Sequence, residues 1–545
     1  MRWKGIFYER RLFPNGWVAG ASLAALALMV PLIVIFSGIL EPTDKVWSHI
    51  VNNLLGTYTM QTLLLMLGVA VCSFVMGVNA AWVVSKYRFP GRRLLEWALI
   101  MPLAIPAYLS GYAWAGMLDY TSPLYSFLRN NFGVHTGQYL FFDLLSLPGA
   151  IVVFSLSLYP YVYLITRTFF QHHAGNMFDA GRSLGLGPWA IYRRLGIPLA
   201  RPAIVAGISL ILMEVLNDYG LVNYFGVETY TTGIFTAWFA FGNVGAAMKL
   251  SALLMVFVLG LLLMEKYQRR NLWYAGQPTY AATHPNRRKV RFGWVITVLT
   301  SLPFVLGFVV PIAAFIHWTV SVDAANHRDF GRLLLNSFQL AATAAVLVTV
   351  LSLFLGFTIR TFPGLLTRVS VRIATLGYAI PGAVVAIGLL VTTLWLDSKG
   401  GGTVLITGSI AALVYAYAVR FMAVGFHSIE SGNERISVHL DQAARSLGSS
   451  LWRTFLRVNL PLMRGPMAVA FMLVLVDVLK ELPLTLILRP FNYDTLAIRA
   501  FEYANDERIA EASPAALVII TAAIIPVILL NLIMKHNPHH KPSQK

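Results

Sequence analysis

Long apolar runs recur along the whole chain and restrict its fold more than any other feature. Twelve runs each hold about 20 residues, the length that an α-helix needs to cross a hydrocarbon core of roughly 30 Å. Of the 545 residues, 57% are hydrophobic and 12% charged, too much apolar surface for a soluble core. Transmembrane β-strands would give ten-residue alternating segments instead. We therefore expect an all-α integral membrane protein with about twelve transmembrane helices. The runs are 17–40, 57–84, 94–118, 143–169, 203–225, 244–264, 292–317, 334–359, 373–396, 403–426, 466–488 and 513–534.

The net charge of +18 follows the predicted membrane topology. Of the 42 lysines and arginines, 32 lie at the two termini or in and beside the loops on one side of the predicted helices. Cytoplasmic loops carry such an excess of basic residues, so both termini are predicted to be cytoplasmic. Because this rule accounts for the basic charge, no nucleic-acid partner is predicted.

The sequence is internally repeated. Asp179 begins the segment DAGRSLGLGPWAIYRRLGIPLARP, and 263 residues later Gln442 begins the similar segment QAARSLGSSLWRTFLRVNLPLMRG. Ten of the 24 aligned residues are identical. The same offset relates EVLNDYG (214–220) to DVLKELP (477–483). Duplicated segments in a membrane protein are typical of transporters built from two related halves.

Six predicted helices in each half make the two repeats parallel, because the first helix of each half then enters the membrane from the same side. A polar, basic stretch with scattered proline and glycine connects them. We expect an N-terminal half at 1–264, a cytoplasmic linker at 265–291 and a C-terminal half at 292–545.

Each repeated segment is expected to form an elbow: a short helix ended by glycine, a second short helix, and a proline before the next span. The elbow offers apolar residues, Leu184 and Trp189 in one copy and Leu447 and Trp452 in the other, flanked by arginines. One interpretation is an interfacial helix that anchors to lipid headgroups. Two copies at the same place in each half favour docking of a two-fold symmetric cytoplasmic partner.

The two segments resemble the EAA signature of ABC-importer permeases, in which the elbow is the coupling helix that contacts the ATPase. The glutamate of that signature is replaced by Asp179 and Gln442, and its second alanine by Gly181 in the first copy. The resemblance implies two copies of a cytoplasmic ABC ATPase as partners. It assigns ATPase coupling to Asp179, Arg182, Ser183, Leu184, Gly185, Trp189, Gln442, Arg445, Ser446, Leu447, Gly448 and Trp452.

The chain has no G-x-x-x-x-G-K-[ST] loop to hold nucleotide phosphates. We therefore expect that it is not an enzyme, that it binds no cofactor, and that the partner subunit uses the ATP. Its single cysteine, Cys72, allows no intrachain disulfide, and its histidines lack the spacing of metal ligands. No metal site is predicted.

Five ionisable residues are expected near the membrane midplane. Glu214 with Asp218, and Asp477 with Glu481, are spaced i,i+4, so each pair is predicted to share one helical face, and Lys480 follows Asp477. Such groups normally line a translocation path. A second possibility is a neutralised network that only fixes helix packing. Since passage requires weak binding, transient contacts with the cargo are expected rather than a storage site.

The stretches EVLNDYGLVNYFGVETYTTGIFTAWF, from Glu214, and DVLKELPLTLILRPFNYDTLAIRAFEYANDERIAEAS, from Asp477, resemble the fused twelve-helix ferric-iron permeases. The resemblance implies a multi-pass protein of the bacterial inner membrane that receives Fe(III) from a periplasmic binding protein. Permeases for thiamine, sulfate, polyamines or phosphonates share the elbow and remain alternatives. An ion-coupled secondary transporter is a further alternative, although it has no evident use for the elbows.

The external loop Arg489–Ser513 carries more acid than any other external segment. It is predicted either to dock the binding protein by charge complementarity or to be an ordinary solvated loop.

Overall fold

The computed structural model describes residues 16–119, 122–132, 143–172, 175–270, 288–289, 292–322, 329–400 and 406–535. Among these residues, ten helices are long and apolar enough to cross a membrane, and two bent helix pairs raise the number to twelve if each pair is one span. The chain is therefore an all-α integral membrane protein, as predicted. In the same part of the chain, β-structure amounts to two residues of β1 (Tyr87–Arg88) paired in parallel with β2 (Arg288–Lys289).

The helices form two compact units that do not follow chain order. The small unit comprises Met1–Val34, Phe338–Ile380 and Gly388–Val478; the large unit comprises Ile35–Ser337, Pro381–Ile387 and Leu479–Lys545. The small unit contains all or most of α1 (Gly16–Ser37), α16 (Phe330–Thr361), α17 (Leu365–Ala374), α18 (Gly382–Lys399), α19 (Ile410–Arg435), α20 (Val438–Ser446), α21 (Leu451–Thr454), α22 (Leu460–Leu462) and α23 (Arg464–Leu479).

The large unit holds the remaining helices. These are α2 (Lys45–His49), α3 (Leu55–Lys86), α4 (Arg92–Ala98), α5 (Ala107–Leu118), α6 (Pro123–Phe132), α7 (Leu147–His172), α8 (Gly175–Ser183), α9 (Pro188–Ile191), α10 (Ile197–Asn217), α11 (Gly220–Tyr224), α12 (Tyr230–Phe235), α13 (Val244–Arg270), α14 (Gly293–Phe304), α15 (Val310–Ser321), α24 (Pro483–Leu488), α25 (Leu496–Asn505) and α26 (Ile509–Lys535).

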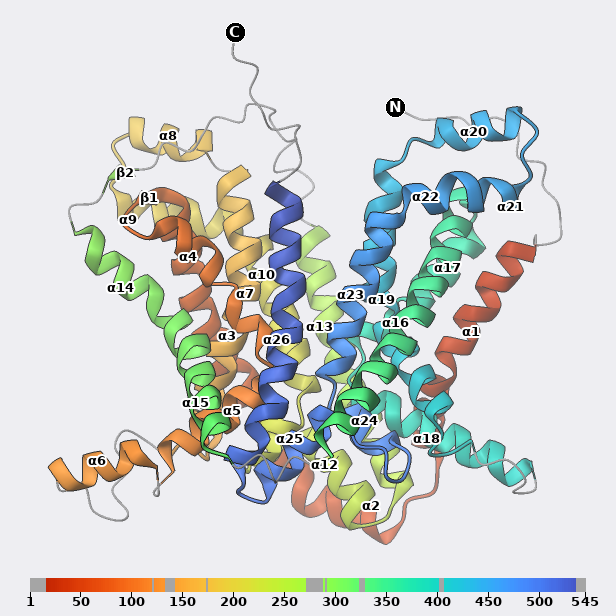
Figure 1. Ribbon diagram of the computed structural model, residues 1–545, viewed down its shortest axis with the longest axis horizontal. Helices are drawn as coiled ribbons and strands as arrows, with labels where there is room; N and C mark the ends of the chain where they lie inside the picture. The colour runs from red at the N-terminus through yellow and green to blue at the C-terminus, as the bar shows by residue number, and fades with distance from the viewer. Residues whose placement is uncertain are drawn as a thin grey trace. The chain divides into compact units, whose positions relative to one another are not determined.

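The first helix of the chain packs on helices that come from the C-terminal part of the sequence. α1 lies beside α16 and α17 in the small unit (Figure 1). The Trp17 ring stacks on Phe354 at a centroid distance of 5.5 Å, and the Ser22 hydroxyl lies 3.0 Å from the Ser370 hydroxyl. Aromatic packing and a shared hydrogen bond thus fix α1 to helices more than 300 residues away in sequence.

The first helices after the linker pack, conversely, on helices from the N-terminal part of the sequence. α14 runs beside α3 and α4 in the large unit (Figure 1). The Thr297 hydroxyl donates to the Pro90 carbonyl at 2.7 Å. At Gly307, a Cβ atom would lie 2.4 Å from the Leu156 carbonyl oxygen, so only glycine permits this approach. The predicted halves 1–264 and 292–545 therefore describe a duplication, whereas each compact unit takes helices from both.

One predicted span is bent rather than straight. The third apolar run forms the pair Arg92–Ala104 and Ala107–Leu118, bent by 92°. Pro106 lies at the bend, and the residue before a proline disfavours the helical conformation, so Ile105 is extended with φ −99° and ψ 115°.

Candidate functional site

Both copies of the repeated segment adopt the helix–glycine–helix elbow. The first elbow consists of α8, the turn at Gly185 and α9; the second consists of α20, the turn at Gly448 and α21. The two glycines are left-handed, with φ of +80° and +81°. In each copy the residue after the glycine donates its N–H to the carbonyl five positions back, at 3.0 Å. This is the Schellman ending, which glycine adopts without steric cost. α8 and α20 run crosswise to α10 and α19, respectively (Figure 1).

Each elbow presents two large apolar side chains on its surface. Leu184 is 82% and Trp189 69% exposed in the first elbow, and Leu447 is 87% and Trp452 56% exposed in the second. Exposed apolar side chains at matching positions are typical of an interaction site. Their role in coupling to an ATPase stays a prediction.

The polar coupling candidates of the two elbows make different local contacts. In the first elbow, the Arg182 guanidinium lies 2.9 Å from the Asp179 carboxylate, and the Ser183 hydroxyl donates to the Asp179 carbonyl at 3.1 Å. In the second elbow, the Gln442 side-chain oxygen lies 3.1 Å from a His439 ring nitrogen. The remaining two candidates, Arg445 and Ser446, form the last turn of α20.

The predicted sharing of one helical face by each acid pair is wrong, because both helices end between the two acids. α10 ends at Asn217, and α23 ends at Leu479. Glu214 and Asp477 remain on these long helices, whereas Asp218 and Glu481 follow the breaks. Lys480 lies in the turn after α23.

The displaced acids cap the short helices that follow. The Asp218 carboxylate accepts the Leu221 N–H at 2.8 Å, and the Glu481 carboxylate accepts the Leu484 N–H at 3.1 Å. These two contacts are related by the same 263-residue offset as the elbows. Each half thus carries a long helix, a break, and a short helix whose N–H groups are satisfied by an acid.

The two breaks meet elements of the opposite half within the large unit. The Asn217 side chain accepts the Gly382 N–H at 2.8 Å, and the Tyr108 hydroxyl donates to the Lys480 carbonyl at 3.4 Å. A Cβ atom on Gly220 would lie 2.8 Å from both Tyr108 and Leu482. We call this set the central junction: residues 217–220 and 480–482 with Tyr108 and Gly382. Within the described part of the chain, no three His, Cys, Asp or Glu side chains are grouped to hold a metal ion.

Comparison with known families identifies this architecture. Residues 71–271 and 349–537 match the family described as binding-protein-dependent transport system inner membrane component. Each stretch contains one elbow and one broken helix, and together they cover more than half of the chain. The chain belongs to this family. It is a permease component of a transport system rather than a catalytic enzyme.

Curated relatives of the permease are named for different cargoes. The Fe(3+)-transport system permease protein FbpB 2 of Haemophilus influenzae is 26% identical over 86% of this chain and 88% of its own length. The sulfate transport system permease proteins CysT and CysW of Escherichia coli are 25% and 26% identical, over 39% and 37% of this chain and 76% and 68% of their own lengths. The sulfate permeases therefore match less than half of this permease, and the Fe(3+) permease matches most of it.

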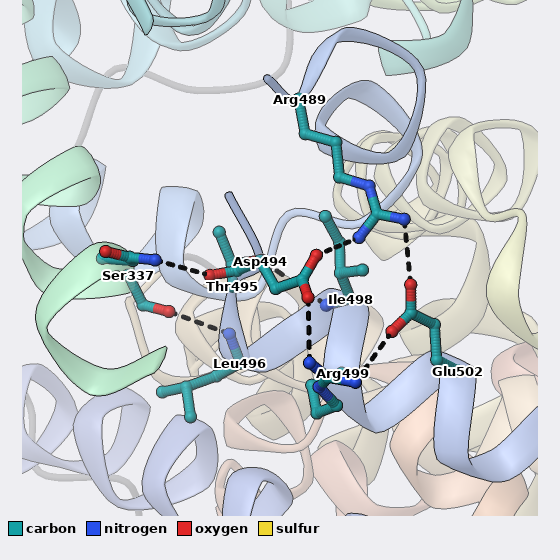
Figure 2. Close-up of polar contacts among 9 residues, drawn as sticks. Ser337, Arg489, Asp494, Thr495, Leu496, Ile498, Arg499 and Glu502 are labelled. Carbon is teal, nitrogen blue, oxygen red and sulfur yellow. Dashed lines mark hydrogen bonds and ion pairs between the residues drawn. The ribbon is translucent and has the colours of Figure 1, made fainter. Parts of the chain in front are cut away.

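The loop Arg489–Ser513, which the sequence predicts to be external, is largely self-neutralised. Arg489 contacts both Asp494 and Glu502, the latter at 2.9 Å, and Arg499 lies 2.9 Å from Asp494 and 3.5 Å from Glu502, which closes a four-membered ring of charges (Figure 2). A third acid, Glu511, pairs with Arg508. Three of the loop's five acids are thus paired; the five are Asp494, Glu502, Asp506, Glu507 and Glu511.

The same loop is attached to the start of α16. The Leu496 N–H donates to the Ser337 hydroxyl at 2.8 Å (Figure 2), and the Tyr493 hydroxyl donates to the Asn336 carbonyl at 3.1 Å. Burial raises the pKa of the Tyr493 phenol, so this donor keeps its proton at neutral pH. The contacts favour a structural role for the loop.

Sequence reasoning missed Phe178 and Asp441, the residues through which the elbows contact their own bundles. Each lies one position before the repeated segment. Identity between the two copies does not mark them, because they differ in chemistry. A search for chemically unlike residues at equivalent positions would have found them.

Proposed function

We propose that this permease is the translocation subunit of an ATP-driven importer that moves Fe(III) from a periplasmic binding protein into the cytoplasm. In this proposal both termini are cytoplasmic, and two copies of a separate ATPase bind the two elbows. The observation that supports the cargo assignment is the similarity to an Fe(3+)-transport permease, 26% identical over 86% of this chain and 88% of that protein.

The geometry supports a mechanical link from the first elbow to the path. Pro188–Asn217 forms a run of 30 helical residues, about 45 Å long at 1.5 Å per residue. It begins in the first elbow and ends at Asn217 in the central junction. An ATPase that displaces the elbow would therefore move the break directly, because a helix transmits motion along its axis.

The acids at the breaks suit a hard cation. Glu214, Asp218, Asp477 and Glu481 offer carboxylate oxygens, the ligands that hard metal ions prefer. Carboxylates along the path would repel the sulfate anion. Sulfate is therefore only the second candidate cargo, although sulfate permeases are among the relatives of this chain. Without a grouped metal site among the described residues, the contacts with Fe(III) would be transient.

Uptake by proteoliposomes that contain the permease, the candidate ATPase and the candidate binding protein tests this function. We expect ATP-dependent uptake of labelled Fe(III) and none of labelled sulfate or thiamine. Sulfate uptake without Fe(III) uptake would reject the cargo, and uptake without the ATPase would reject the whole proposal.

A further inference from the structure

The residue just before each repeated segment differs in chemistry between the two elbows. Phe178 on α8 and Asp441 on α20 are equivalent at the 263-residue offset. Phe178 is 1% exposed, and the Asp441 side chain is 19% exposed. A phenyl ring and a carboxylate cannot make the same contacts, so the two elbows are held by different interactions.

The first elbow is held by aromatic packing. The Phe178 ring lies 5.2 Å from the Trp82 ring, and the Lys86 ammonium lies 4.1 Å from the Phe178 centroid. Trp82 also packs at 5.1 Å on Tyr192, which follows α9. Both arms of the elbow therefore meet one cluster at the end of α3. We call Phe178, Trp82, Lys86 and Tyr192 the aromatic anchor.

In the second elbow, the contacts at the equivalent position are ionic. Arg360 donates its Nε–H to the Asp441 carboxylate at 2.6 Å, and the Asn459 amide donates to the other carboxylate oxygen at 3.0 Å. Asn459 follows α21, so the two arms of this elbow also meet. Arg360 further donates to the carbonyls of Asn433 and Ile436, at 2.8 and 3.0 Å, at the end of α19. We call Asp441, Arg360 and Asn459 the charged anchor.

A second pair of equivalent positions changes together with the first. Asn459 corresponds to Gly196 at the same offset. A Cβ atom on Gly196 would lie 2.8 Å from the Trp82 ring, so the aromatic anchor needs a residue without a side chain there. The charged anchor needs the Asn459 amide at that place. The two anchors thus hold the two arms of an elbow in equivalent places with two different sets of matched residues.

We propose that the two anchors are separate positioning devices, one aromatic and one ionic, and that each independently fixes its own elbow to the helices it moves. Arg360 is the central positioning residue of the second elbow, because it joins α16, the end of α19 and α20. This inference rests on the proposed coupling of the elbows to an ATPase.

Hydrogen exchange of the full-length permease tests the anchors without ATPase or cargo. Asp441→Ala removes the acceptor of a charge-assisted hydrogen bond, so exchange of the α20 amides should rise about tenfold or more. Exchange of α8 should not change. Phe178→Leu, which keeps an apolar side chain but loses the ring, should speed exchange in α8 and leave α20 unchanged. If either variant loosens both elbows, or neither, the anchors are not separate devices.

Transport coupling tests the positioning role. In proteoliposomes, Asp441→Ala and Arg360→Lys should lower the Fe(III) imported per ATP hydrolysed, whereas Asp441→Asn, which keeps an oxygen acceptor, should recover part of it. Glu430→Gln is the matched control, because Glu430 is an exposed acid on α19 that pairs with His427. An unchanged ratio in Asp441→Ala with faster α20 exchange would overturn the positioning role. Absence of uptake by the unaltered permease would instead reject the proposed cargo or partner, and the exchange result would stand.

Discussion

At the scale of single residues, one backbone angle distinguishes two glycines of the first elbow. Gly185 is left-handed, with φ +80°, and Gly187 is extended, with φ −67°. A Cβ atom on either would meet no heavy atom within 4 Å. Because neither position is crowded, a difference between alanine variants at these positions reports mainly the backbone conformation.

Gly185→Ala should therefore weaken the elbow by about 1–2 kcal/mol, the cost of a left-handed L-residue. Gly187→Ala is the matched control and should cost less, about 0.5 kcal/mol, because alanine is disfavoured only as the N-cap of α9. The measurement is Fe(III) uptake with the ATPase, together with hydrogen exchange of α8. Equal behaviour of the two variants would show that the left-handed turn is not needed.

A second residue-scale prediction separates the capping of α11 by Asp218 from the proposed contact of its charge with the cargo. Its carboxylate caps α11 through the Leu221 N–H, and asparagine caps helices nearly as well as aspartate. Asp218→Asn should therefore keep the stability of the permease but lower Fe(III) uptake, because the negative charge is lost. Asp218→Ala should lower both, with the lost cap worth about 1 kcal/mol. Unchanged uptake in Asp218→Asn would restrict this acid to capping.

At the scale of elements, hydropathy predicted where helices lie but not where they break. The runs 203–225 and 466–488 are mostly apolar on both sides of the break, so hydropathy alone marks no interruption. In the second run, Pro483 gives a physical signal, because its ring would clash with the carbonyl of residue 479, where α23 ends. In the first run, Gly220 has no such effect, and the break depends on tertiary contacts with Tyr108 and Leu482.

The elbows were predictable because they depend on local backbone geometry rather than on tertiary contacts. Gly185 and Gly448 act through local backbone geometry, which the sequence encodes directly. The anchors were not predictable in this way, because the role of Asp441 depends on its contact with Arg360, which is 81 residues away in the sequence.

The ring of charges in the loop Arg489–Ser513 supports an element-scale prediction about stability. Arg489 contacts Asp494 and Glu502, and all three side chains are 24–32% exposed. Arg489→Ala should lower the thermal unfolding temperature of the purified permease slightly, because partly exposed ion pairs contribute about 1 kcal/mol or less. The difference should shrink in 1 M salt, where the Debye length is about 3 Å. Asp506→Asn, outside the ring, is the control. A loss that persists in high salt would point to packing instead.

At the scale of the whole molecule, each compact unit is built from both halves of the sequence. α1 contributes Trp17 to the small unit, where it packs on Phe354 and lies 5.9 Å from Trp452 of the second elbow. α14 and α15 contribute to the large unit, where the Thr297 hydroxyl donates to the Pro90 carbonyl of the N-terminal half at 2.7 Å. Neither half therefore holds all the apolar partners that its own helices need.

A cut in the linker between Thr283 and His284, outside the described residues, tests this interdependence. Each fragment expressed alone should be degraded, because helices that lose their packing partners expose small and polar residues to lipid. The two fragments expressed together should assemble and restore Fe(III) uptake, since the exchanged helices need no continuous chain between them. A second pair, in which the first fragment starts at Leu40, lacks Trp17 and should fail to assemble fully. The contrary result would be a C-terminal fragment that is stable alone, with native-like hydrogen exchange in α16 and α17. In that case the packing of α1 on these helices would contribute little to the fold.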